Sequence, residues 1–174
     1  MEKPVSSDFR SSALAIFAQA LEDCSPSRLI SDRLDFHNDT LAGKTFTLFV
    51  DPVRKLHLVA LGKAAQAMAC ALINIVGKER VRGVAVVPAA GPPAPAPIRT
   101  LRGNHPIPGA HSFRAGAALL KSMETAGAGS AVVHLISGGA SAMVAAPLEG
   151  LVSTREKALL HRLLVGRGLD IRDI

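Results

Sequence analysis

The sequence contains no tryptophan and no tyrosine, and its only aromatic residues besides histidine are six phenylalanines. Proteins that bind single-stranded nucleic acid stack the bases on aromatic side chains, so this composition argues against such a partner. The formal net charge is +6, but the basic residues are scattered and form no recognisable nucleic-acid-binding module. The charge therefore favours a small anionic ligand, if it reflects any partner at all.

Cysteine and long apolar runs are scarce as well. Cys24 and Cys70 stand alone, without the spacing of a metal site, and are expected to be reduced core thiols. No apolar stretch approaches the roughly 18 residues of a membrane span. Residues 1–12 include Glu2 and Asp8 and contain no apolar run, so no signal peptide is visible. These features predict a cytoplasmic protein with no membrane partner.

What the sequence does contain is typical of a globular α/β protein. At 174 residues, 48% hydrophobic and 20% charged, it suits one domain or a large part of one. Strands that alternate with helices predict a three-layer, Rossmann-like fold, with a mostly parallel sheet and helices on both faces. The expected strands are 45–50, 56–61, 83–87, 98–101 and 131–136. The expected helices are 8–24, one opening at Pro26, 64–75, 111–126, 153–165 and one beginning at Asp170. Ser153 and Glu156 predict a capping box at the start of the helix 153–165. A turn-forming stretch is expected at 35–43 and a Pro- and Ala-rich loop at 88–97.

The stretch from 131 to 141 is the most informative. Its first six residues are apolar except for His134, which predicts a strand buried on both faces. The strand leads into the loop Ser137, Gly138, Gly139, Ala140, Ser141. Adjacent glycines can turn successive backbone N–H groups into one concavity that binds anions, and the two serines add hydroxyl donors. A plain glycine turn after a core strand is an equal alternative.

Two further strand ends carry polar residues. The strand 56–61 leads into Gly62 and Lys63 and then a helix, so an ammonium group lies beside a helix N-terminus. This favours phosphate binding over a merely solvated lysine. The strand 98–101 leads into a Pro-rich loop with His105, which either lines a site or makes an ordinary loop hydrogen bond. Because carboxyl ends of parallel strands share one edge, we expect the three loops to converge on one crevice.

Three motifs in order resemble the class II glycerate 2-kinase family, also labelled MOFRL-type glycerate kinase or hydroxypyruvate reductase. They are Val-Ala-Leu-Gly-Lys-Ala-Ala (59–65), Asn-His-Pro-Ile-Pro (104–108) and Leu-Ile-Ser-Gly-Gly-Ala-Ser-Ala (135–142). The resemblance covers nearly the whole chain and identifies it with the N-terminal domain of that family. It implies phosphorylation of the 2-hydroxyl of D-glycerate with ATP and Mg²⁺, in a cleft between two α/β domains.

The resemblance also implies roles for residues of this chain. Lys63 corresponds to the family's catalytic lysine. The substrate- or phosphate-binding positions are Gly62, His105, Ser137, Gly138, Gly139 and Ser141. Ala140 replaces a third glycine of the family, which would cost about 1 kcal/mol or more if that position needs a positive φ. No metal ligands are assigned.

The family continues beyond the segment that this sequence covers, with an Asn-x-x-Arg motif and a second domain. We therefore expect residues 1–174 to be a truncated N-terminal domain that lacks complete catalytic machinery on its own, with the missing C-terminal domain as its partner. A homo-oligomer is compatible with the sequence. One alternative function is a non-catalytic anion- or nucleotide-binding module. A weaker one is an NAD(P)-dependent hydroxypyruvate reductase, because no G-x-G-x-x-G follows a strand.

Overall fold

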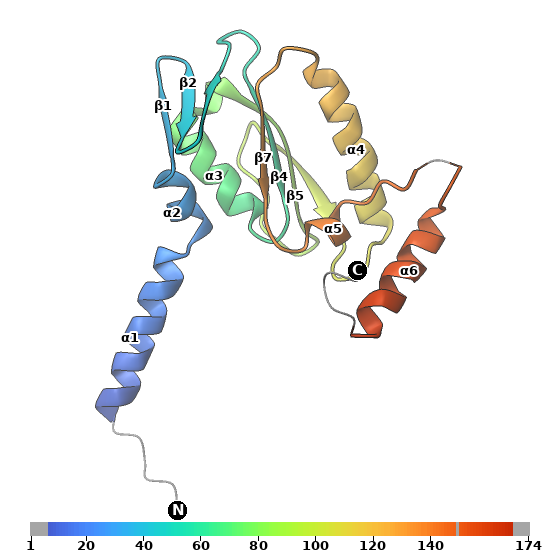
Figure 1. Cartoon of the computed structure of the whole chain (residues 1–174), viewed down its shortest axis with the longest axis horizontal. Helices are drawn as coiled ribbons and strands as arrows, with labels where there is room; N and C mark the ends of the chain where they lie inside the picture. Colours follow the sequence, from blue (N-terminus) through green and yellow to red (C-terminus); the bar gives the residue numbers. More distant parts are fainter. Residues whose placement is uncertain (1–6, 149, 169–174) are drawn as a thin grey trace, which may run out of the picture.

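A computed structural model describes residues 7–148 and 150–168 of the chain (Figure 1). Its centre is a four-stranded sheet in the order β6-β5-β4-β7, in which every neighbouring pair is parallel. The strands are β4 (Leu56–Leu61), β5 (Val81–Pro88), β6 (Arg99–Gly103) and β7 (Val132–Ile136). Because all four run in the same direction, their carboxyl ends lie along a single edge.

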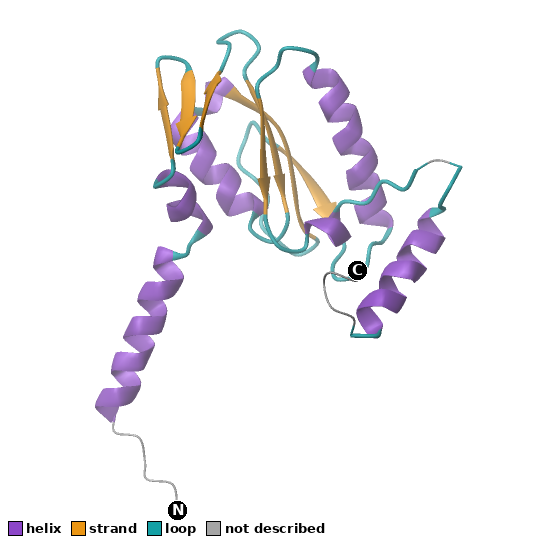
Figure 2. Ribbon diagram, viewed as in Figure 1, coloured by secondary structure: helices purple, strands orange, loops and turns teal. Residues whose placement is uncertain are grey.

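Helices cover both faces of this sheet, which confirms the predicted α/β class (Figure 2). The alternation of side chains along β4 separates two apolar layers. Leu58 and Ala60 pack in the layer that contains α3 (Ala65–Val76), whereas Val59 and Leu61 pack in the layer with α4 (Ala110–Ala126) and α5 (Ala140–Met143). All six residues of β4 are buried, as expected for a central parallel strand.

A small antiparallel sheet precedes the parallel one. It contains β1 (Leu34–His37), β2 (Thr40–Gly43) and β3 (Phe46–Phe49) in sequence order, after the short helix α2 (Pro26–Ser31). The prediction of a turn-forming stretch at 35–43 was wrong, because only Asn38 and Asp39 turn, with φ of 47° and 59°. The predicted strand 45–50 forms, but it pairs with β2 in this separate sheet.

The side chain of Arg80 joins the two sheets. This residue ends the 3-10 helix η1 (Lys78–Arg80), just before β5. Its Nη2 lies 2.7 Å from Oδ1 of Asp39 and donates to the carbonyl oxygen of Val50 at 3.0 Å. The guanidinium also lies over the ring of Phe36, 5.6 Å from its centre. One side chain thus holds the β1–β2 hairpin against the start of β5.

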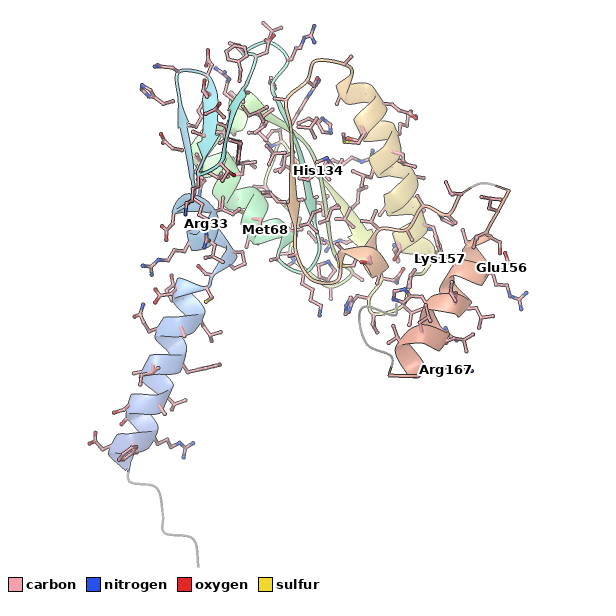
Figure 3. The ribbon with its side chains drawn as sticks, in the orientation of Figure 1. Arg33, Met68, His134, Glu156, Lys157 and Arg167 are labelled. Carbon is pink, nitrogen blue, oxygen red and sulfur yellow. The ribbon has the colours of Figure 1, made fainter. Side chains whose placement is uncertain are left out.

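Strand β7 differs from its prediction. It lies at the edge of the sheet, and only one of its faces is covered. His134, midway along the strand (Figure 3), is exposed, and Ile136 is 65% exposed. The expectation of a strand buried on both faces was therefore wrong: the apolar run predicted the strand, but its place in the sheet leaves one face open.

Two helices stand away from the sheet in Figure 1: α1 (Ser7–Asp23) and α6 (Thr154–Gly166). The predicted capping box of α6 is confirmed, since the Ser153 and Glu156 amides each donate to the other's side chain, at 2.8 and 3.2 Å. Cys24, after α1, is an exposed free thiol, which corrects the expectation of a core position. The helix predicted from Asp170 lies outside the described residues. None of the helices in the described ranges has the length and apolar character needed to cross a bilayer.

Candidate functional site

The Gly62–Lys63 turn sits where β4 passes into α3. Gly62 has a φ of +105°, a conformation that residues with a Cβ rarely adopt. A methyl group at this position would lie 2.5 Å from both the carbonyl oxygen and the Oγ of Ser137. The amide of Lys63 donates to the carbonyl oxygen of Gly138 at 3.0 Å. Glycine at 62 thus lets the turns after β4 and β7 pack against each other.

Ser137 fastens these two turns together. Its hydroxyl donates to the carbonyl oxygen of Leu61 at 3.1 Å and accepts from the amide of Ala64 at 3.0 Å. Its own amide donates to Leu61 as well, at 2.9 Å. The hydroxyl was expected to point at an anion, but its hydrogen bonds are made within the protein. Ser137 therefore positions the loop, and the backbone that follows it is what faces outward.

The loop after Ser137 leads directly into α5. Gly139 is left-handed, with φ of 90° and ψ of −5°, and precedes the first helical residue, Ala140. Ala140 is helical and partly buried, so alanine there meets no requirement for a positive φ and does not distort the loop. Ser141 is exposed in the same first turn. The substitution of alanine for glycine therefore leaves the loop geometry intact.

The His105 loop reaches the same place from β6. A methyl group at Gly139 would lie 2.9 Å from Cδ2 of His105, 3.3 Å from its Nε2 and 3.5 Å from Cε of Lys63. The imidazole of His105 and the stem of Lys63 therefore both lie close to the backbone of Gly139. The structure therefore brings together the ends of β4, β6 and β7, as the three motifs predicted.

Lys63 and His105 line a hollow of about 390 Å³ at this edge of the sheet. The other lining residues are Pro88, Ala89, Ala90, Gly103 and Asn104, which follow or end β5 and β6. The wall formed by the loop after β5 is held by Arg102, whose guanidinium donates to the carbonyl oxygens of Pro88 and Gly91. None of these lining residues is acidic.

The electrostatics of the hollow suit an anion. His105 is exposed, and the limited desolvation that remains lowers the pKa of its imidazole; the charge of Lys63 and a smaller effect of His161 lower this pKa further. A neutral imidazole beside an ammonium leaves the hollow positive without two adjacent full charges. Sequence reasoning missed His161, because no motif marks it: it is brought near His105 only by the placement of α6.

Asn104 anchors the loop that carries His105. Its side-chain oxygen accepts from the amide of His111 at 3.1 Å, in the first turn of α4, and its own amide donates to Oγ of Ser112 at 3.0 Å. Gly109 is tight against it, since a methyl group there would lie 2.7 Å from the Asn104 oxygen. The loop that carries the His105 imidazole is therefore held in place by hydrogen bonds to the first turn of α4.

The described residues 7–148 and 150–168 contain no group of three or more His, Cys, Asp or Glu side chains placed to hold a metal ion. Since no carboxylate lines the hollow either, the donor set that Mg²⁺ prefers is not found there. The ammonium, the imidazole and the glycine backbone fit an oxyanion instead.

The chain is thus an α/β domain in which the carboxyl ends of parallel strands surround a hollow lined by a lysine and a histidine. A family model described as a domain of unknown function, DUF4147, matches residues 12–174, so the chain belongs to this family. It is 30% identical over 172 residues to a glycerate 2-kinase of Pyrococcus horikoshii, covering 98% of this chain and 38% of that protein. The resemblance to the N-terminal domain of class II glycerate kinases is thereby confirmed.

Two solved structures are similar in fold. A glycerate kinase of Thermotoga maritima superposes with a TM-score of 0.73 at 26% identity, over 97% of this chain and 37% of that one. A Pyrococcus horikoshii protein superposes with a TM-score of 0.79 at 28% identity, over 97% of this chain and 38% of that one.

A putative hydroxypyruvate reductase of Agrobacterium vitis is similar in sequence. It is 28% identical over 117 residues, which are 67% of this chain and 30% of that protein. The chain thus spans less than half the length of these relatives.

Proposed function

We propose that this chain is the N-terminal domain of a glycerate 2-kinase, which transfers the γ-phosphoryl group of ATP to the 2-hydroxyl of D-glycerate. The observation that carries the proposal is the approach of Lys63 and His105 to the backbone of Gly139. An ammonium, an imidazole and a glycine-cradled loop at one strand edge are the groups that a phosphate or carboxylate needs. Relatives named glycerate kinases support the choice of reaction.

Lys63 acts on the transferred phosphoryl group. In phosphoryl transfer, negative charge spreads over the three equatorial oxygens, and catalysis consists largely of positioning and charge stabilisation. The amide of Lys63 is held by Gly138, and its stem lies against Gly139, so its ammonium is presented in a defined place. A fixed cation of this kind stabilises the transition state without reorganisation during the reaction.

His105 and the loop backbone orient the reactants. Because its pKa is lowered, the imidazole of His105 is neutral at neutral pH and can accept a hydrogen bond from the substrate hydroxyl. The first turn of α5, with Ser141 at its surface, offers backbone N–H groups to an oxyanion. Ser137 and Gly62 hold that turn against Lys63, so they are positioning residues.

ATP fits this description through its phosphates. The residues that would hold them are Lys63, His105 and the Gly138–Ser141 backbone; bound ATP supplies the phosphoryl group that is transferred. Mg²⁺ does not fit the residues that line the hollow, because none of them is a carboxylate. We assign no magnesium ligand to this chain and derive no step through the metal.

The reductase named for one relative is the alternative activity. It would need a dinucleotide-binding turn, and the Gly62-Lys63-Ala64 turn lacks the second and third glycines that such turns use. A non-catalytic anion-binding module is the alternative without turnover. The reductase and the binding module each predict a different result from the kinase in assays of the same purified protein.

The test is an assay of the full-length gene product with D-glycerate and ATP-Mg²⁺. We expect glycerate-dependent ADP formation, with ³¹P NMR showing the phosphate on the 2-hydroxyl. In parallel, hydroxypyruvate with NADH or NADPH should give no oxidation of the nucleotide. Nucleotide oxidation without ADP formation would replace the kinase with a reductase. Saturable anion binding without either turnover would leave only the binding module.

A further inference from the structure

A second hollow, of about 270 Å³, lies at the opposite edge of the parallel sheet, between its amino ends and α4. His57 of β4, Arg82 of β5 and Arg99 of β6 line it from the sheet. Lys121, Ser122 and Thr125 line it from α4. The register pairs His57 with Arg82 and Val84 with Arg99, so these side chains come from three adjacent strands.

The charge lining this hollow is of one sign. Arg82, Arg99 and Lys121 are cationic, and no acidic residue lines the space. Within residues 7–148 and 150–168, the ion pairs of the structure involve Arg28 and Arg80, so none of these three cations is neutralised by one. Like charges collected around a cavity repel one another, and an anion placed among them relieves that repulsion.

Two buried polar atoms of the lining residues His57 and Arg82 have no hydrogen-bond partner. His57 is only 4% exposed; its Nε2 lies 3.1 Å from Oγ of Ser122, but its buried Nδ1 has no hydrogen-bond partner. The buried Nε of Arg82, on the neighbouring strand, has none either. Native proteins rarely leave buried polar atoms without a partner, so this end of the sheet is incompletely paired. Because solvent does not reach these two atoms, an anion in the hollow would contact the other atoms of the cationic side chains that line it.

We propose that this hollow is a binding site for a small oxyanion with at least two negative charges, namely phosphate or the phosphate group of a small phosphomonoester. Arginine side chains bind such groups through paired charge-assisted hydrogen bonds, and the Ser122 hydroxyl can supply one more. The site is independent of the proposed kinase reaction. The two hollows lie at opposite ends of the same strands. The second is lined near the amino ends of β4, β5 and β6, whereas the first is lined where these strands end.

His57 is a built-in reporter of occupancy. Burial lowers the pKa of its imidazole, and the charges of Arg82 and then His134 on β7 lower it further. The cations Arg99 on β6 and Lys121 on α4 face the same space. A bound dianion offsets their effect, so its arrival should raise the pKa of His57 and shift its ring resonances.

The test is an NMR titration of the full-length protein, uniformly isotope-labelled, with inorganic phosphate at constant ionic strength and pH. The His57 ring signals and the Ser122 amide should shift along a single saturable curve. Replacing both arginines, Arg82→Gln with Arg99→Gln, should weaken that binding by about 100-fold, two charge-assisted contacts at roughly tenfold each. Arg10→Gln, which removes one exposed charge from α1, should leave the affinity unchanged.

Two further variants keep the outcome unambiguous. Should the double variant not fold, Arg99→Gln with Lys121→Gln removes two exposed cations and should weaken binding to a similar degree. Lys63→Met should abolish phosphate-induced shifts around Gly139 and leave those at His57 unchanged. The proposal is overturned if phosphate shifts no His57 signal up to tens of millimolar, or if the cation-lowering variants bind as well as the wild type. Substituting glycerol 2-phosphate for phosphate then shows whether a phosphomonoester also enters.

Discussion

The approach of Lys63 and His105 to the backbone of Gly139 is the residue-scale feature on which the proposed site depends. Because the charge of Lys63 helps to lower the pKa of His105, its removal should raise that pKa toward the ordinary value of about 6.5. We expect Lys63→Met to do so in an NMR pH titration of the His105 ring. Lys44→Met, at an exposed position, should leave the His105 pKa as it is. An unchanged pKa in Lys63→Met would mean that the ammonium does not face the imidazole.

The adjacent glycines of the loop provide a matched pair of substitutions. A methyl group at Gly139 meets His105 and Lys63 and needs a left-handed backbone, whereas one at Gly138 meets nothing within 4 Å. Gly139→Ala should therefore lower the free energy of unfolding by about 1 kcal/mol or more. It should also weaken phosphate binding at the first hollow, with Gly138→Ala close to wild type in both. Equal effects of the two variants in denaturation and binding experiments would contradict this geometry.

At the scale of elements, the structure depends on the joint between the ends of β4 and β7. The Ser137 hydroxyl bonds to both Leu61 and Ala64. Ser137→Ala should lower the free energy of unfolding in urea by about 1–2 kcal/mol, because it leaves the Ala64 amide without its acceptor and removes one of the two hydrogen bonds to the Leu61 carbonyl. Ser141→Ala, four residues along and exposed, should leave stability unchanged and weaken anion binding only. If Ser141→Ala destabilised the fold as much, Ser137 would not be the fastening residue.

Several elements could be predicted from local sequence, and others could not. Strand β4, helix α3 and the capping box of α6 are confirmed because apolar periodicity and cap residues specify them locally. The β1–β2 hairpin was missed because Asp35 and His37 give the stretch a polar character, although Leu34 and Phe36 alternate with them on the covered face. The exposure of His134 could not be predicted, since it depends on β7 being an edge strand, which only the sheet order determines.

In the candidate site, too, some features could be predicted from local sequence and others depend on how the strands and turns pack. Glycines, a lysine and a histidine at strand ends predicted a shared hollow, because parallel strands place their carboxyl ends together. Lys63 and His105 line it, whereas the other predicted site residues are not among its lining residues: Gly62, Ser137, Gly138, Gly139 and Ser141. The bonding of Ser137 depends on how closely two turns approach, and no motif encodes that distance. The second hollow had no sequence signal at all: His57, Arg82 and Arg99 are far apart in the chain and meet only through the register of three strands.

At the scale of the whole molecule, α1 is notable for how little of its surface is buried against the rest of the described chain. Every side chain from residue 8 to residue 23 is exposed, including Phe9, Ile16 and Phe17. A 17-residue helix that buries so little of its apolar side chains is marginally stable in water. In this chain, amide hydrogens of α1 should therefore exchange much faster than those of β4, whose residues are all buried. Equal protection of both elements, at several protein concentrations, would show that something covers α1.

The central claim is that Lys63 performs phosphoryl transfer at the edge where β4, β6 and β7 end. The most direct measurement is the turnover number for glycerate-dependent ADP formation by the full-length protein, in wild type, Lys63→Ala and the exposed control Lys44→Ala. We expect Lys63→Ala to lower kcat by about 100-fold or more with an unchanged unfolding transition, and Lys44→Ala to match the wild type. A folded Lys63→Ala variant with a near-normal kcat would contradict the claim.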